Sequence, residues 1–324
     1  MIKSKKSIEN LTPYKTDKYK QSWRLKLDSN ENIYGTSNAV ISAIKNFNPE
    51  DISIYPCYGK LVDKIAQKYN LNTDNIILTN GCDEALNILI TTYLDNNDEI
   101  LSYNPCFSMP DLYAEIQGGK VKKINYDDKF IFNKNTVLNN ITTSTKIFYI
   151  ATPNNPTGET VKASILELII QEKPNTLFII DCTYVNFASD VAFGDYLDLA
   201  KKYNNVAVVK SFSKDYGLAG LRLGFVVANN VIIKELQKIA SPYNVNIIAI
   251  SCAIAAMNDE KYFEEIKELN IQAKELLYQG LLEKGGLPHK SQGNFILCDF
   301  GDYADFYYNK LKNNGVIVRN YSKN

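Results

Sequence analysis

The sequence lacks the residues and runs that several classes of protein require. Its 324 residues include one histidine, His289, and six cysteines that lie far apart with no C-x-x-C pair. This set predicts no metal site, and scattered thiols are typical of a reducing, cytoplasmic compartment. No apolar run approaches the ~20 residues of a membrane span, and the basic amino terminus has no apolar stretch behind it. We therefore expect neither a membrane anchor nor a signal peptide.

An excess of charge of one sign is also missing. The chain has 36 Lys and Arg residues against 36 Asp and Glu residues, so its formal net charge is zero. Such a balance gives no basic field that would attract nucleic acid or an anionic membrane. Because 45% of the residues are hydrophobic and the chain is long, it can form a large core and two domains.

Apolar runs and helical spacing alternate along the middle of the chain. The expected strands are Ile76–Thr79, Glu99–Tyr103, Val121–Tyr126, Lys146–Ala151, Leu177–Asp181 and Val206–Lys210, and the clearest helices are Asp83–Tyr93, Met109–Gln117 and Ser164–Gln171. This order predicts an α/β fold with three layers, in which helices cover both faces of a mostly parallel sheet. Ligands of such sheets bind at the carboxyl ends of the strands.

The two ends of the chain differ from this middle part. Residues 1–30 are polar and predict an amino-terminal arm that must dock to become ordered. We expect a large ligand-binding domain over residues 31–245. The tail reads as strand, helix and strand, which predicts a smaller α/β domain over residues 246–324.

The stretch from Ser211 to Gly224 carries the strongest chemical signal. Lys214 follows an expected buried strand on a glycine-rich turn, where partial desolvation favours its neutral, nucleophilic amine. Ser211, Ser213 and Arg222 could surround a phosphate there, Arg222 through its fixed guanidinium fork. Taken alone, such a lysine is far more often a surface residue on a turn.

Other strand ends carry groups that could also face a ligand. Cys82 and Asp83 open an expected helix, whose free amides and dipole favour a phosphate. Phe107 could stack on a flat ring, and the prolines around Asn155 restrict the backbone so that its amide can be held towards a ligand. Asp181 ends an apolar strand, where a carboxylate is costly to bury without a partner. Each also has a structural interpretation, as a helix cap, a core aromatic or a turn residue.

Together these motifs resemble a known family. S-x-S-K-x-x-G-L-x-G-x-R-x-G from Ser211, N-N-P-T-G from Asn154 and D-x-x-Y from Asp181 resemble the fold-type I, pyridoxal phosphate (PLP) dependent aminotransferases of class I/II. Finer segments are similar to histidinol-phosphate aminotransferases in particular: Asn10–Tyr14, Leu27–Asn32, Tyr55-Pro56 and Pro242–Asn246.

The resemblance implies a role for each site residue. Lys214 would bond to PLP and move a proton, Asp181 would pair with the pyridine nitrogen, and Phe107 would stack on the ring. The remaining assignments are Asn155 and Tyr184 on the phenolate oxygen, and Cys82, Asp83, Ser211, Ser213 and Arg222 around the phosphate. Tyr55 would reach the phosphate of a partner subunit, which implies a homodimer. Tyr14 and Arg319 would face the substrate.

The sequence also departs from the family pattern. It reads D-C-T-Y where members usually read D-E-A-Y, and Phe107 stands where a tyrosine is usual. Members normally continue beyond Asn324 through an L-R-I-T-x-G strand whose arginine binds the substrate carboxylate, so we expect phosphorylated amines to react better than glutamate. The implied reaction converts histidinol phosphate and 2-oxoglutarate to imidazole acetol phosphate and glutamate. A decarboxylase of serine or threonine phosphate, or an inert structural or regulatory partner, remains the alternative.

Overall fold

A seven-stranded sheet forms the centre of the computed structural model, which describes residues 2–9, 11–12 and 23–322. The strands lie in the order β2-β8-β7-β6-β5-β3-β4. Their bounds are β2 Ile76–Thr79, β3 Glu99–Asn104, β4 Lys120–Asn125, β5 Thr145–Ala151, β6 Leu177–Asp181, β7 Val206–Ser211 and β8 Gly224–Ala228. Only β8 runs antiparallel to its neighbours β2 and β7. The predicted α/β fold with a mostly parallel sheet is confirmed.

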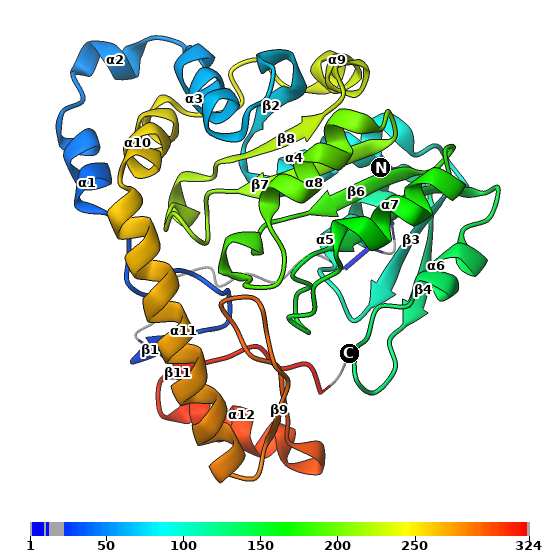
Figure 1. Cartoon of the computed structure of the whole chain (residues 1–324), viewed down its shortest axis with the longest axis vertical. Helices are drawn as coiled ribbons and strands as arrows, with labels where there is room; N and C mark the ends of the chain where they lie inside the picture. Colours follow the sequence, from blue (N-terminus) through cyan, green and yellow to red (C-terminus); the bar gives the residue numbers. More distant parts are fainter. Residues whose placement is uncertain (1, 10, 13–22, 323–324) are drawn as a thin grey trace.

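Helices cover both faces of this sheet, because alternate strand residues point to opposite sides (Figure 1). Phe178 and Ile180 of β6 belong to one core cluster, whereas Ile179 belongs to the other. The first face is covered by α3 (Gly59–Tyr69), α7 (Ala163–Glu172), α8 (Phe193–Lys202) and α10 (Ile247–Asn258), and the second by α4 (Gly81–Tyr93), α5 (Met109–Gln117) and α9 (Asn230–Ile239). The result is a three-layer structure.

Shorter helices complete this part of the chain. They are α1 (Asn38–Lys45), α2 (Pro49–Ser53) and α6 (Lys134–Asn140), together with the single 3₁₀ turns η1 (Thr73–Asn75), η2 (Val185–Phe187) and η3 (Ala219–Leu221). The Ser37 side chain accepts a hydrogen bond from the amide of Val40 and so caps the amino-terminal end of α1.

The carboxyl-terminal elements lie below the sheet in Figure 1, beside the long helix α11 (Glu260–Glu283). They comprise β9 (Leu287–Pro288), β10 (Cys298–Asp299), η4 (Gly301–Tyr303), α12 (Ala304–Asn313) and β11 (Val316–Ile317). β10 pairs with β9, and β11 pairs in parallel with β1 (Leu25–Lys26). The two expected tail strands, β10 and β11, are thus only two residues long each. They do not pair with one another: β10 pairs with β9, and β11 pairs with β1.

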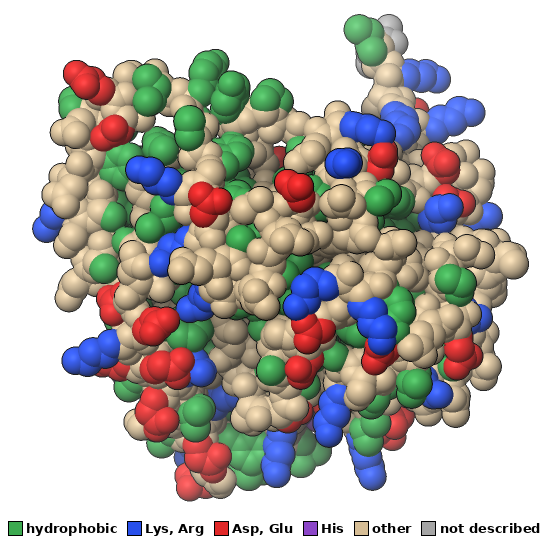
Figure 2. All heavy atoms as spheres, turned by 45° about the horizontal axis from the view of Figure 1, so that its top comes forward, with side chains coloured by type: hydrophobic (Ala, Val, Ile, Leu, Met, Phe, Trp, Pro, Cys, Tyr) green, Lys and Arg blue, Asp and Glu red, His purple; other side chains and the backbone are tan. Residues whose placement is uncertain are grey.

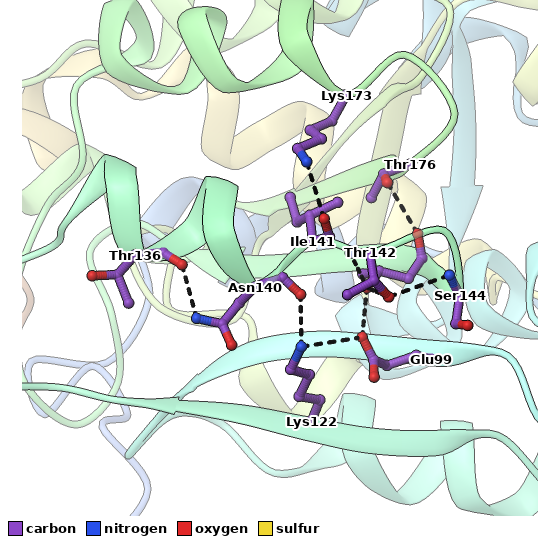
Figure 3. Close-up of polar contacts among 10 residues, drawn as sticks. Glu99, Lys122, Thr136, Asn140, Ile141, Thr142, Ser144, Lys173 and Thr176 are labelled. Atoms are coloured by element: carbon purple, nitrogen blue, oxygen red, sulfur yellow. Dashed lines mark hydrogen bonds and ion pairs between the residues drawn. The ribbon is translucent and has the colours of Figure 1, made fainter.

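Hydrogen bonds and ion pairs connect neighbouring elements at the edge of the sheet where β3 and β5 begin (Figure 3). Lys122 Nζ donates to the Asn140 carbonyl at 2.7 Å, and Lys173 Nζ donates to the Ile141 carbonyl at 3.0 Å. Both cations sit at the carboxyl end of α6, where the helix dipole favours positive charge. This edge is therefore structural, and the opposite edge carries the candidate site.

Two classes of feature are not found within the described ranges. No helix there is both long and apolar enough to cross a membrane. No group of three or more His, Cys, Asp or Glu side chains among those residues could hold a metal ion.

Candidate active site

Lys214 lies on the turn that follows β7. Its Nζ donates a hydrogen bond to the Ser29 carbonyl at 2.7 Å. Burial lowers the pKa of Lys214 from 10.5 to about 8, against the nearby charge of Glu31, which acts to raise it. A large fraction of the amine is therefore neutral near pH 8, which is the form that attacks a carbonyl carbon.

A cradle for an anion forms where α4 begins. Arg222 lies so close to Gly81 that a Cβ there would be 2.4 Å from Arg222 Nη2, and the same nitrogen is 3.1 Å from Asp83 Oδ2. A Cβ on Gly224 would be 3.0 Å from the Cys82 amide nitrogen. These glycines let backbone and guanidinium come together at the positive end of the helix dipole.

Ser211 and Ser213 lie beside this cradle at the end of β7. Both are buried, and the Ser211 hydroxyl accepts a hydrogen bond from the Ser213 amide at 3.0 Å. Ser211 also faces the Cys82 thiol, whose pKa burial raises to about 12. Cys82 is thus a neutral thiol, and its backbone amide is the group suited to an anion.

Asp181 ends β6 as a buried carboxylate that is 5% exposed. Its Oδ1 accepts from the Thr183 amide at 2.9 Å, and its Oδ2 accepts from the Tyr149 hydroxyl at 3.1 Å. Burial raises the pKa of Asp181, while these hydrogen bonds and the charge of Lys210 lower it. A cationic partner would complete the environment that a buried carboxylate requires.

Tyr184 is held by amide donors from two loops. Its hydroxyl oxygen accepts from Asn30 Nδ2 at 3.1 Å and faces Asn155 Nδ2 at 3.5 Å, so its own proton is available to a third group. Phe295 packs edge-on against the Tyr184 ring, with 4.9 Å between ring centroids. Lys214 Nζ lies 5.7 Å from the centre of the same ring. The structure thus brings Lys214, Tyr184 and Asn155 together.

Phe107 lies on a loop that is tied to the N-N-P-T-G segment. Asn154 Nδ2 donates to the Pro105 carbonyl at 3.1 Å, which fixes the two loops against each other. Phe107 is half-buried and packs against the core cluster that also contacts Cys82. The ring thus has both core contacts and an exposed part.

Tyr55, Arg319 and Tyr14 are the remaining predicted site residues. Tyr55 is 74% exposed and stacks on Tyr243 with 4.3 Å between ring centroids. Arg319 is exposed, two residues from Tyr321, whose charge helps to raise the pKa of Tyr184. Tyr14 lies outside the described residues.

Sequence reasoning missed Asn30 and the buried pair Lys210–Asp215. Asn30 belongs to the Leu27–Asn32 segment, which resembled the family but suggested no role for an individual residue. Asn30 has φ 51°, and its carbonyl accepts from Asn294 Nδ2 at 3.0 Å, so this segment is held over the Lys214 turn.

Known proteins with similar sequences and folds identify the family of this chain. The model of the family "Aminotransferase class I and II" matches residues 24–323. The histidinol-phosphate aminotransferase of Geobacillus sp. (strain WCH70) is 32% identical, over 97% of this chain and 89% of that protein. The enzyme of the same name from Methanocaldococcus jannaschii is 33% identical, over 91% of this chain and 80% of that protein.

Solved structures show the same fold. A putative histidinol-phosphate aminotransferase from Erwinia carotovora atroseptica superposes with a TM-score of 0.85 at 25% identity, covering 90% of this chain and 86% of that one. The Sinorhizobium meliloti enzyme, solved in complex with pyridoxal-5'-phosphate, has a TM-score of 0.87 at 23% identity and covers 92% of this chain and 83% of that one. The chain belongs to the class I and II aminotransferases, which depend on pyridoxal phosphate.

Proposed function

We propose that this aminotransferase acts on a phosphorylated amine, with histidinol phosphate as amino donor and 2-oxoglutarate as acceptor. The observation that carries the catalytic part is Lys214, whose pKa of about 8 keeps a reactive amine beside Tyr184 and Asn155. Support for the substrate comes from the relatives, because the enzymes from Geobacillus and Methanocaldococcus jannaschii bear that name.

The residues present fit PLP. Asp181 is a buried carboxylate that a protonated pyridine nitrogen would neutralise. The cradle of Gly81, Gly224 and Arg222 at the start of α4 offers backbone amides and a guanidinium, which suit an anionic phosphate. When bound, PLP withdraws electrons from the substrate's α-carbon.

Each side chain then has a task. Lys214 Nζ would move the proton between the substrate's α-carbon and the C4′ atom of PLP, which requires the neutral amine that burial favours. Asp181 would hold a proton on the ring nitrogen by its negative charge. The Tyr184 hydroxyl and the Asn155 amide would donate to the ring oxygen, and Phe107 would support the ring from its half-buried position.

The phosphate would be bound by Arg222, the hydroxyls of Ser211 and Ser213, and the amides of Cys82 and Asp83. Asp83 now pairs with Arg222, so the arriving phosphate would share that guanidinium with the carboxylate. Arg319 and Tyr14 remain our candidates for contacts with the substrate.

Exposed apolar side chains support a homodimer. Figure 2 shows green side chains gathered over the part formed by the first helices; the exposed members there include Ile41, Ile44, Ile52 and Ile54. A cavity of about 520 Å³ lies among α1, α2 and α10, with Tyr55 in its lining. Such a patch is typical of an interface, and the family resemblance would have Tyr55 reach the phosphate site of a second copy. Six free cysteines suit a cytoplasmic setting.

Single half-reactions test the substrate class. The PLP-loaded protein is mixed separately with histidinol phosphate, histidinol and glutamate, and the conversion of PLP to pyridoxamine phosphate is followed. We expect histidinol phosphate to react fastest, because a charged phosphate contact adds roughly 1.5–3 kcal/mol of binding. Equal rates with histidinol and histidinol phosphate would contradict the phosphorylated-amine proposal, and release of CO₂ from serine or threonine phosphate would favour a decarboxylase.

A further inference from the structure

A fully buried ion pair, Lys210–Asp215, lies at the turn that carries the candidate catalytic residue Lys214. Lys210 Nζ is 2.6 Å from Asp215 Oδ2, and the two side chains are 1% and 0% exposed. Lys210 belongs to β7 and Asp215 follows Lys214 in the chain, so the pair closes the turn that carries Lys214. None of the chemistry assigned above to the site uses either residue.

The pair also reaches the turn that follows β6. Lys210 Nζ lies 3.5 Å from the Thr183 carbonyl, and Asp215 Oδ2 accepts from Asn186 Nδ2 at 2.5 Å. The amide of the same Thr183 donates to Asp181 Oδ1 at 2.9 Å. Thr183 is therefore fixed on both sides, immediately before Tyr184.

Stability alone does not explain such a pair. Moving two charges out of water is costly, and well-packed apolar side chains of similar volume are often at least as stabilising. An aromatic ring lies on one side of the pair, since Lys210 Nζ is 5.9 Å from the centre of the Phe193 ring. What the pair adds over an apolar contact is a directional link between two turns.

We propose that Lys210 and Asp215 are positioning residues that fix the Lys214 turn against the Asp181–Tyr184 turn. This inference rests on the proposed function, because it assigns the pair to the geometry of that site. Because both side chains of this link are buried, motion of surface side chains would not change the distance between Lys214 and Tyr184.

The charge of Lys210 has a second effect at the same place. It lowers the pKa of Asp181, and it also lowers the pKa of the neighbouring thiols Cys82 and Cys182. A variant that lacks Lys210 therefore loses this charge as well as the link between the two turns.

The test is the double variant K210M/D215L, in which apolar side chains replace the pair. Against wild type we measure the melting temperature of the apo-protein, its Kd for PLP, and kcat and KM for histidinol phosphate. We expect an unchanged or higher melting temperature, a kcat lower by roughly 10- to 100-fold, and a KM within about threefold, because misplacement affects the reacting groups. The Kd for PLP should rise as well.

A matched control is the surface pair Lys202–Glu167, whose atoms are 2.7 Å apart but whose side chains are 60% and 30% exposed. The variant K202M/E167Q should leave all four quantities unchanged. A folded K210M/D215L protein with wild-type kcat and wild-type Kd for PLP would overturn the inference.

A second variant keeps the test decisive if K210M/D215L does not fold. Asn186→Ala removes one hydrogen bond to Asp215, and it should lower kcat severalfold at an unchanged KM; an unchanged kcat would overturn the inference. If wild-type protein binds PLP but does not transaminate, the proposed function fails on its own. Equal Kd values for PLP in wild type and variant would then still decide against the pair.

Discussion

At the scale of single residues, burial sets the chemistry of the site. Lys214 and Asp181 are both taken out of water, and burial shifts each towards its neutral form: the pKa of Lys214 falls to about 8 and that of Asp181 rises. For Lys214 this yields a nucleophile. For Asp181 it creates a demand for a cationic partner, which a protonated ring nitrogen would meet.

The pKa of Lys214 gives a prediction with a definite sign. In the apo-protein the neutral fraction should rise as pH increases through about 8, well below the ordinary lysine value of 10.5. Competitive labelling with an amine-specific reagent, read by mass spectrometry, should therefore show a midpoint near that value. Lys202, which is exposed and whose pKa is raised by its hydrogen bond to Glu167, serves as the upper reference. A Lys214 midpoint equal to the reference would show that burial does not act on this amine.

The variant Lys214→Ala should lose the visible absorbance that PLP gains on bonding to a lysine, together with all half-reactions. The cause is loss of the amine that both bonds PLP and moves the proton. Absorbance and half-reaction rates are measured after reconstitution. Transamination at the wild-type rate would remove Lys214 from the chemistry.

The variant Asp181→Asn keeps shape but removes charge. It should still bind PLP yet lose about 10²–10³-fold in kcat, as is typical when one electrostatic partner is removed. Steady-state kinetics at saturating PLP measure this. Near-normal kcat would reduce Asp181 to a structural residue of the turn.

At the scale of elements, close backbone approach shapes the phosphate cradle. Gly81 opens α4 with φ 79°, and Gly224 opens β8 against the same turn. Side chains at these places would collide with Arg222 and with backbone. The positive helix end is therefore accessible only because both residues are glycine.

Gly81→Ala should accordingly weaken PLP binding by at least tenfold and lower stability by about 1–2 kcal/mol, from left-handed strain and the clash with Arg222. PLP titration and thermal melting measure the two effects. Gly280→Ala in α11 is the matched control, since a Cβ there meets nothing within 4 Å. That change should be neutral or stabilising by about 0.5–1 kcal/mol. Full PLP affinity in the Gly81 variant would refute the cradle.

Element by element, strong local patterns were predictable and tertiary pairings were not. Strand β6 and helix α5 have the expected bounds, because an uninterrupted apolar run and a regular helical spacing mark them. Helix α6 was not expected, since only Val137 of its residues is buried and the pattern is weak. The tail strands β10 and β11 are shorter than the sequence pattern indicates. β11 pairs with β1, some 290 residues away in the chain, and no local pattern reveals such a partner; β10 pairs with β9.

The site residues likewise differ in how well the sequence predicts them. Motifs that stand at strand ends, such as Lys214 and Asp181, could be placed from sequence because parallel strands end at one edge. The contact from Asn30 to Tyr184 joins residues 154 positions apart. The Lys210–Asp215 pair could not be predicted from the sequence either. The burial of Lys210 depends on Asp215, and only the folded turn after β7 brings the two side chains together.

At the scale of the whole molecule, an exposed apolar face lies around α1, α2 and α10. Tyr55 stands on that face, and no contact among the described residues links it to the Lys214 site of its own chain. A dimer would resolve both points, because it would bury the face and supply the hydroxyl to the partner's phosphate.

Tyr55→Phe should weaken PLP binding without disturbing assembly, since one hydrogen bond to a charged group contributes roughly 1.5–3 kcal/mol. PLP titration measures the first effect and analytical ultracentrifugation the second. A monomeric wild-type protein that retains PLP fully would show that no partner residue is needed.

Borohydride reduction of the PLP-loaded protein tests the central claim most directly, because it fixes PLP permanently to the lysine that carries it. Trypsin should then fail to cleave after Lys214 and release the peptide Ser211–Arg222 with a phosphopyridoxyl group on Lys214. We predict this modified peptide as the single major adduct. An adduct on Lys210 or on any other lysine, or no adduct at all, would contradict the account.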